Sequence, residues 1–195
     1  MYHINNDKRQ IASAQKIVDG LTQCLSAKMM SEISVSDIAT ASGVSRSSFY
    51  RSFDTPMDVL AYACDRVLDM LLRDYAGIDL DQRDELVLFS LKYWRGHSQI
   101  LEALANCDRM DIIQRTLVNH GGEFLTNEIK KLRTDFSKDE IEYLSKGVAA
   151  LLTSTLQVWI QHGKKETPEE LFILYKKIGN YKQSPEPTQR PQAKR

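Results

Sequence analysis

Apolar residues recur along the chain at the three- and four-residue spacing of amphipathic helices, and Pro and Gly are sparse before the last residues. The first stripe predicts a helix over 7–28 and consists of Ile11, Ala14, Ile17, Val18, Leu21 and Leu25. Gly20 should weaken this helix by about 1 kcal/mol relative to Ala. Later stripes and breaks predict further helices over 35–42, 46–52, 56–75, 81–95, 98–107, 108–132, 138–162 and 168–181. The predicted fold class is therefore all-α, with about nine helices.

Strong helix-boundary signals fall close together near the N-terminus. Ser34 and Asp37 have the spacing of a capping box, in which two side chains satisfy unpaired backbone donors at the start of a helix. Gly43 can take the left-handed conformation that ends a helix, and Ser45 offers the next N-cap. Two short helices joined by a three-residue turn form the helix-turn-helix arrangement, whose second helix enters the major groove of DNA.

The second of these helices, predicted over 46–52, divides into an apolar face and a polar face. Phe49 and Phe53 are four residues apart and should anchor the helix in the core. The other positions carry Arg, Ser and Tyr. Arg can donate two hydrogen bonds to guanine, whereas Ser and Tyr hydroxyls can bond phosphate oxygens. The pattern therefore predicts a recognition helix.

The segment from about Lys8 to Leu60 resembles the DNA-binding domain of TetR-family transcriptional regulators. The family's motifs match at Ser34–Ala39, at Thr40–Ser45 (with Thr40 in place of Ala) and at Tyr50–Phe53. The resemblance implies groove contacts from Ser36, Arg46, Ser47 and Arg51, and phosphate contacts from Ser34, Ser45, Ser48, Tyr50 and Thr55. Simpler roles remain open: the caps Ser34, Ser45 and Thr55 serve only the helices, the two arginines are solvated, and Tyr50 only packs.

One position departs from the family pattern. Members usually carry Lys three residues after the motif Phe, and here that position is Pro56. Losing one phosphate contact should flatten the dependence of log K on log salt by about 0.9. The backbone N–H groups of Met57 and Asp58, in the first turn of the helix that Thr55 caps, are alternative phosphate donors.

The C-terminal helices carry wide apolar stripes, and a short recognition helix needs a second copy to gain useful affinity. The stripes resemble the region in which TetR regulators form a four-helix dimer interface. The predicted interface consists of Leu144, Val148, Leu151, Leu152, Thr155, Leu156, Trp159, Phe172 and Tyr175. The alternative is an ordinary pair of core helices.

The helices between the two ends should form the regulatory body. Its candidate effector-binding residues are Phe89, Tyr93, Trp94, His97, Cys107, Met110, His120 and Phe124. Aromatic, Met and Cys side chains at helical spacing also serve as plain core, so this set is a hypothesis about a pocket.

Composition excludes several other classes of protein. The 195 residues are 42% hydrophobic, and no apolar run approaches the ~18 residues of a membrane span, so we expect a cytoplasmic protein, nucleoid-associated when bound to DNA. The three cysteines are far apart, and the four histidines lie near no catalytic motif, so no metal site, cofactor or catalytic residue is predicted and an enzyme is disfavoured.

Charge is balanced overall, with 26 basic and 26 acidic residues, but it is unevenly distributed. Residues 1–53 carry six basic and four acidic side chains, and residues 176–195 carry six basic and one acidic. A mildly basic end on an acidic body is typical of a protein of which a small part meets phosphate.

Together these patterns predict a DNA-binding domain over 1–55, an effector-binding and dimerisation domain over 56–181, and a disordered basic tail over 182–195. The expected function is that of a TetR-type regulator, most simply a repressor, that binds a pseudo-palindromic double-stranded operator as a homodimer and responds to a small-molecule effector. The alternative is a TetR-like activator or adaptor controlled by a protein partner.

Overall fold

The structure of the chain is a computed structural model, which describes residues 2–5, 7–78, 85–132 and 136–179. The all-α class is confirmed: these residues form ten α-helices and one 3₁₀ turn. The elements are α1 (Lys8–Leu25), η1 (Met30–Glu32), α2 (Val35–Ser42), α3 (Arg46–Tyr50), α4 (Pro56–Ala76), α5 (Leu86–Gly96), α6 (Ser98–Asn106), α7 (Asp111–Asn119), α8 (Gly122–Leu132), α9 (Lys138–Gln161) and α10 (Pro168–Gly179).

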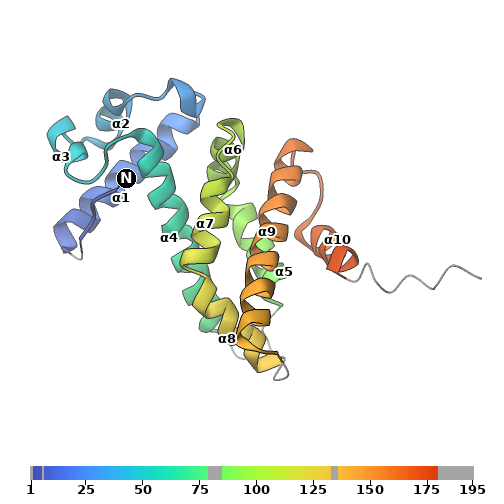
Figure 1. The fold of residues 1–195 in the computed structure, drawn as a ribbon. Helices are drawn as coiled ribbons and strands as arrows, with labels where there is room; N and C mark the ends of the chain where they lie inside the picture. Colours follow the sequence, from blue (N-terminus) through green and yellow to red (C-terminus); the bar gives the residue numbers. More distant parts are fainter. Residues whose placement is uncertain (1, 6, 79–84, 133–135, 180–195) are drawn as a thin grey trace, which may run out of the picture.

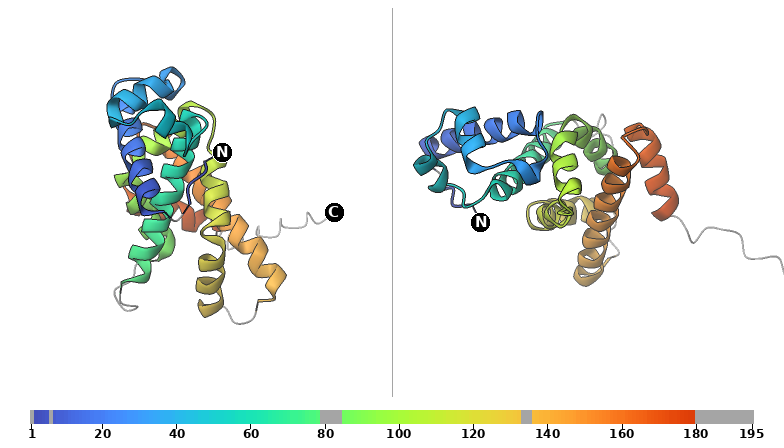
Figure 2. Two further views of the ribbon diagram at one scale, coloured as in Figure 1. Left: turned by 90° about the vertical axis from the view of Figure 1, so that its left-hand side faces the viewer. Right: turned by 90° about the horizontal axis from the view of Figure 1, so that it is seen from above.

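The helices are arranged along one long connector. Helices α1 to α3 gather at one end of the molecule, and α4 runs from them into the remaining helices (Figure 1). Helices α9 and α10 lie at the side farthest from α1 to α3, and the view from above agrees (Figure 2, right). One face of α4 is apolar and buried along its whole length, which ties the two ends into a continuous core.

Several helix boundaries differ from the sequence predictions, among them the end of the first helix, which lies at Leu25 rather than Lys28. The helix predicted over 108–132 is two helices, because the chain breaks at His120 and Gly121. A Cβ atom at Gly121 would lie 2.6 Å from the Leu117 carbonyl oxygen, so glycine suits this tight break. The recognition helix ends at Tyr50 rather than Ser52. The predicted helix start at residue 81, the predicted helix end at residue 181 and the predicted tail over 182–195 lie outside the described residues.

Gly20 has a packing role that its helix propensity does not reveal. It is buried where α1 crosses α2, and a Cβ atom there would lie 2.8 Å from Ser42 Cβ, 2.9 Å from Ser42 N and 3.0 Å from Ile38 O. These distances are far inside ordinary carbon contacts of about 3.5–4.0 Å. The two helices can therefore approach this closely only because residue 20 lacks a side chain.

Candidate nucleic-acid interface

The helix-turn-helix is held by local hydrogen bonds that the sequence predicted. Ser34 Oγ accepts from Asp37 N–H at 3.2 Å, and Asp37 Oδ2 accepts from Ser34 N–H at 2.8 Å, which completes the capping box of α2. Gly43 has φ +65° and ends α2 in the left-handed conformation. Ser45 Oγ then accepts from Ser48 N–H at 3.1 Å and starts α3. The end of α2 and the start of α3 are thus fixed by their own flanking residues.

Helix α3 presents a polar face over an aromatic anchor. Phe49 and Phe53 are fully buried, with ring centroids 5.8 Å apart, which confirms that they anchor the helix. Arg46 and Ser47 are exposed, and the Tyr50 ring is 49% exposed while it packs edge-on against Phe49. The accessible side chains on α3 are therefore those that can hydrogen-bond bases or phosphates.

Arg51 lies just past the end of the recognition helix. Its Nη2 donates to Ser48 Oγ at 2.7 Å, and Ser48 Oγ also accepts from Ser45 Oγ at 3.0 Å. This chain of bonds holds the Arg51 guanidinium against α3 in the free protein. The Arg51 guanidinium must release Ser48 Oγ before it can extend farther from the protein, whereas the Arg46 side chain is exposed.

At the N-terminus of α4, one of the two backbone donors predicted for a phosphate is already used, while the role of the other, the Met57 N–H, stays a prediction. Asp58 N–H donates to Thr55 Oγ1 at 3.2 Å, so this donor is already used. Asp58 Oδ2 accepts from Thr55 N–H at 3.0 Å and from Thr55 Oγ1 at 2.9 Å, which places a carboxylate at the helix terminus. The proposed role of the Asp58 N–H as a phosphate donor is wrong, because a phosphate there would meet a like charge.

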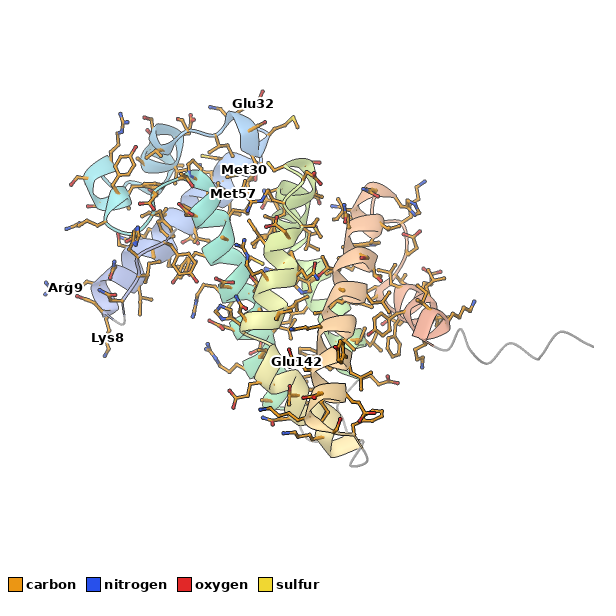
Figure 3. The ribbon with its side chains drawn as sticks, in the orientation of Figure 1. Lys8, Arg9, Met30, Glu32, Met57 and Glu142 are labelled. Carbon is orange, nitrogen blue, oxygen red and sulfur yellow. The ribbon has the colours of Figure 1, made fainter. Side chains whose placement is uncertain are left out.

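Two basic residues that the sequence analysis did not select lie in the first turn of α1. Gln10 Nε2 donates to the Arg51 carbonyl at 3.4 Å, which brings this turn beside the end of α3. Lys8 and Arg9 are exposed here and extend away from the protein (Figure 3). The signal that could have found them is the pair of adjacent basic residues directly after the N-cap Asp7.

Lys28, in contrast, is committed to a carboxylate. Its Nζ lies 2.7 Å from Asp37 Oδ1, and this hydrogen bond, with those from Ser34, holds the pKa of the Asp37 carboxyl well below its usual range. The charges of Lys28 and Asp37 neutralise each other, so Lys28 adds little to an electrostatic field that attracts DNA. Ser36, which precedes Asp37 in α2, is exposed.

The structure brings together half of the predicted effector-binding residues. Four of the eight lie in one row of rings that also includes Tyr75, with neighbouring ring centroids 5.2–5.9 Å apart. The order along the row is Phe124, Tyr75, Phe89, Tyr93 and His97. The other four lie apart from this row: Trp94 and Met110 are buried in the core, Cys107 follows α6, and His120 faces Asp65 and Asp69.

An apolar cavity of about 40 Å³ lies between α4, α5, α7, α8 and α9. Of the eight predicted effector residues, Phe124 lines it. Its other walls include Leu68, Leu71, Leu86, Leu117, Gly121 and Leu152, which the sequence analysis did not select because Leu is the commonest core residue.

The predicted dimer residues divide between the core and the surface. Leu152, Leu156, Trp159 and Phe172 are buried within the chain, and Trp159 Nε1 donates to the Glu166 carbonyl at 3.0 Å. Val148 and Tyr175 are half-buried, while Leu144, Leu151 and Thr155 lie along the more open face of α9. On that side, a groove of about 250 Å³ between α9 and α10 is lined by Leu151, Thr155, Val158, Leu174 and Ile178, among others.

The described residues contain no helix long and apolar enough to cross a bilayer. They also bring together no group of three or more His, Cys, Asp or Glu side chains that could hold a metal ion.

The all-α fold and the exposed polar face of α3 define a transcriptional regulator of the helix-turn-helix class. Residues 81–180, slightly more than half of the chain, match the TetR model for the C-terminal region of transcriptional regulators. The chain belongs to the TetR family of transcriptional regulators, as its N-terminal motifs suggested.

Three solved structures share this fold. The fatty acid degradation regulator FadR from Bacillus halodurans superposes with a TM-score of 0.62 at 14% identity, covering 90% of this chain and 96% of that one. A TetR transcriptional regulator from Streptococcus agalactiae gives 0.59 at 17% identity, covering 88% and 96%. The TetR family repressor AlkX from a Dietzia species, implicated in biodegradation of n-alkanes, gives 0.57 at 17% identity, covering 86% and 94%. No curated protein matches the chain.

Proposed function

We propose that this TetR-family regulator is a repressor that binds a pseudo-palindromic DNA operator as a homodimer and is released by an apolar effector. The observation that carries the proposal is the exposed Arg46, Ser47 and Tyr50 on a helix held in place by the buried Phe49. Residues 1–55 would contact DNA, and the helices from Pro56 onward would bind the effector and the second copy.

The proposed DNA contacts fall into two kinds. Arg46, Ser47, Ser36 and, once released from Ser48, Arg51 would reach base edges, where an Arg–guanine pair is worth about 1–3 kcal/mol of discrimination. Phosphates would be held by Tyr50, Lys8 and Arg9 and by the hydroxyls of Ser34, Ser45 and Ser48. The Thr55 hydroxyl, which donates to the Asp58 carboxylate, would contribute least. Because those hydroxyls already cap helices or bond each other, we assign them smaller contributions than the charged side chains.

A duplex selected from a random-sequence pool on the purified protein tests the DNA assignment. Arg46→Ala should weaken binding of the selected duplex by about tenfold to a hundredfold and relax the preference at one base pair. Arg115→Ala, an exposed arginine on α7, is the matched control and should bind normally. Selection of no duplex, or equal affinity for Arg46→Ala, would refute the groove assignment.

Lys8 provides a separate test of the phosphate contacts. Lys8→Ala should weaken all duplexes alike and reduce the slope of log K against log salt by about 0.9. A change in base preference, or an unchanged slope, would contradict a phosphate role.

The proposed dimer face is the exposed apolar surface along α9 and α10. Val158 is 46% exposed, Leu174 47% and Ile178 57%, and they border the same groove. Exposed apolar side chains that gather on one face mark interfaces more often than scattered ones do. Two copies of α9 and α10 packed on this face would bury it in a four-helix interface.

Sedimentation of charge-bearing variants tests this face. Leu174→Asp should convert a dimer into a monomer, because it would bury an unpaired charge. Met29→Asp, at an equally exposed apolar residue near α1, should leave the dimer intact. A wild-type protein that sediments as a monomer at all concentrations would refute the proposal.

The proposed effector is apolar because the cavity that Phe124 and Leu117 line has almost no polar wall. The names of two structural relatives, a fatty acid degradation regulator and a repressor implicated in n-alkane biodegradation, concern similarly apolar molecules. The cavity of about 40 Å³ has room for one or two carbon atoms, so a longer chain requires its walls to move. Decanoate and decane, titrated against the protein–duplex complex, should each be tested for release of DNA.

The same small volume favours a second candidate, control by a protein partner. In that case apolar molecules would leave the protein–duplex complex unchanged, and a tagged chain would retrieve one stoichiometric protein.

A further inference from the structure

A short segment at the N-terminus, Tyr2–Asn5, lies across the end of the recognition helix; we call it the strap. Tyr2 forms an antiparallel bridge with Phe53, and His3 N–H donates to the Ser52 carbonyl at 2.8 Å. Gln10 Nε2 donates to the His3 carbonyl at 2.6 Å and fixes the strap from the side of α1. The backbone that follows α3 is therefore held directly by the strap.

The Tyr2 side chain leaves the strap and bonds to the connector helix α4. Its hydroxyl donates to Asp65 Oδ2 at 2.6 Å, and its ring packs edge-on against Tyr62 with centroids 5.2 Å apart. Burial and the Asp65 carboxylate raise the pKa of Tyr2 far above its ordinary value, so the hydroxyl remains a donor at any physiological pH.

The same carboxylate is shared with the regulatory body. Thr116, buried on α7, donates its hydroxyl to Asp65 Oδ1 at 2.5 Å. The Asp65 side chain is only 14% exposed, and its two oxygens accept from different parts of the chain, Oδ2 from the strap and Oδ1 from α7. One turn later on α7, His120 Nε2 lies 3.6 Å from Asp65 Oδ1 and Nδ1 lies 3.4 Å from Asp69 Oδ1.

A row of rings continues from Tyr2 to the recognition helix. Tyr62 packs on Phe53 at 5.6 Å, and Phe53 packs on Phe49 at 5.8 Å between centroids. Because close-packed rings transmit displacement rather than absorb it, a shift of Tyr2 reaches α3 through both the rings and the strap backbone.

The other end of this connection reaches the apolar cavity. Leu117 and Gly121, which line the cavity, directly follow Thr116 and His120 in the chain. In Figure 1, α4 lies between α3 and α7, and Asp65 on α4 is the residue to which both the strap and α7 donate.

We propose that Tyr2, Asp65 and Thr116 form the connection through which α7 sets the position of the recognition helix, with Tyr2 as the positioning residue. That this positioning alters DNA binding rests on the proposed function. The connection itself is a property of the free chain. The alternative is that these three residues form only a local hydrogen-bond network, which would stabilise the contact between α4 and α7 and leave α3 unaffected.

Hydrogen–deuterium exchange of the full free chain distinguishes the two. Thr116→Val removes the α7 donor and should speed exchange of the amides over 46–53 by about tenfold, with amides in the middle of α9 unchanged. Thr116→Ser, which keeps the hydroxyl, should restore normal exchange. Tyr93→Phe is the matched control: its hydroxyl donates to Asp74 at 3.0 Å on the same helix α4, without reaching the strap, and α3 should not respond.

The converse variant tests reciprocity. Tyr2→Phe should speed exchange over 46–53 and also around Thr116, and the double variant should exchange no faster over 46–53 than the faster single one. Faster exchange confined to α4 and α7, or equal in every helix, would overturn the proposal. Because neither DNA nor effector is present, these outcomes do not depend on whether the chain binds an operator.

Discussion

Replacing Gly20 with Ala sets two effects of opposite sign against each other. On helix propensity alone, Gly20→Ala in α1 should stabilise the protein by up to about 1 kcal/mol. The structure predicts the opposite, because the new Cβ would lie 2.8–3.0 Å from Ser42 Cβ, Ser42 N and Ile38 O. Two of these three atoms belong to the backbone of α2, so no rotamer change relieves the contact.

The magnitude follows from the displacement. Carbon atoms normally approach to about 3.5–4.0 Å, so α2 must move by roughly 0.5–1 Å, and overpacking of this kind typically costs about 1–3 kcal/mol. After subtracting the gain in propensity of about 1 kcal/mol, we expect a net loss of up to about 2 kcal/mol in the free energy of unfolding.

Urea denaturation followed by helical circular dichroism measures this loss. Ala12→Gly, at an exposed position of the same helix, is the control: it should cost about 1 kcal/mol and so establish the propensity difference in α1. If Gly20→Ala is more stable than the wild type by the propensity difference that Ala12→Gly measures, the close approach of α1 and α2 is not what keeps residue 20 small.

Three further predictions concern single side chains. Burial lowers the pKa of His97 in the folded chain below its ordinary value of about 6.5. At a pH between these two pKa values the unfolded chain binds more protons than the folded chain. The free energy of unfolding should therefore be full above about pH 6.5 and fall as the pH drops below it. His97→Asn should flatten this fall in urea denaturation, and an identical profile would contradict the assignment. Burial raises the pKa of Cys64 to about 12, so native Cys64 should resist iodoacetamide at about pH 8 and react only after unfolding; peptide mass spectrometry showing equal labelling of both forms would disprove this. Thr55→Ala should cost about 1 kcal/mol because Asp58 N–H loses its acceptor, whereas Thr55→Ser should unfold like the wild type.

Helix α3 could be predicted closely because its signals are local. Capping by Ser34, the left-handed Gly43 and the Ser45 cap each depend on residues within four positions, and all three occur as predicted. The C-terminal stripes were predicted as helices for the same reason. Which of their faces meets the rest of the chain could not be predicted, because α9 carries apolar residues on more than one side and burial of Leu152 rather than Val158 depends on distant partners.

The sequence by itself determined the helices, their caps, the anchoring of α3 and the family, since these depend on spacing along the chain. Only the tertiary structure decided that α2 approaches α1 closely at Gly20, and that the strap and α7 share Asp65. Tyr2 and Thr116 lie on either side of Asp65 in the sequence, 63 and 51 positions from it, and no periodicity or motif encodes such a meeting. The physical reason is that backbone hydrogen bonding and capping act over a few residues, whereas steric exclusion and shared acceptors arise only once the helices have packed.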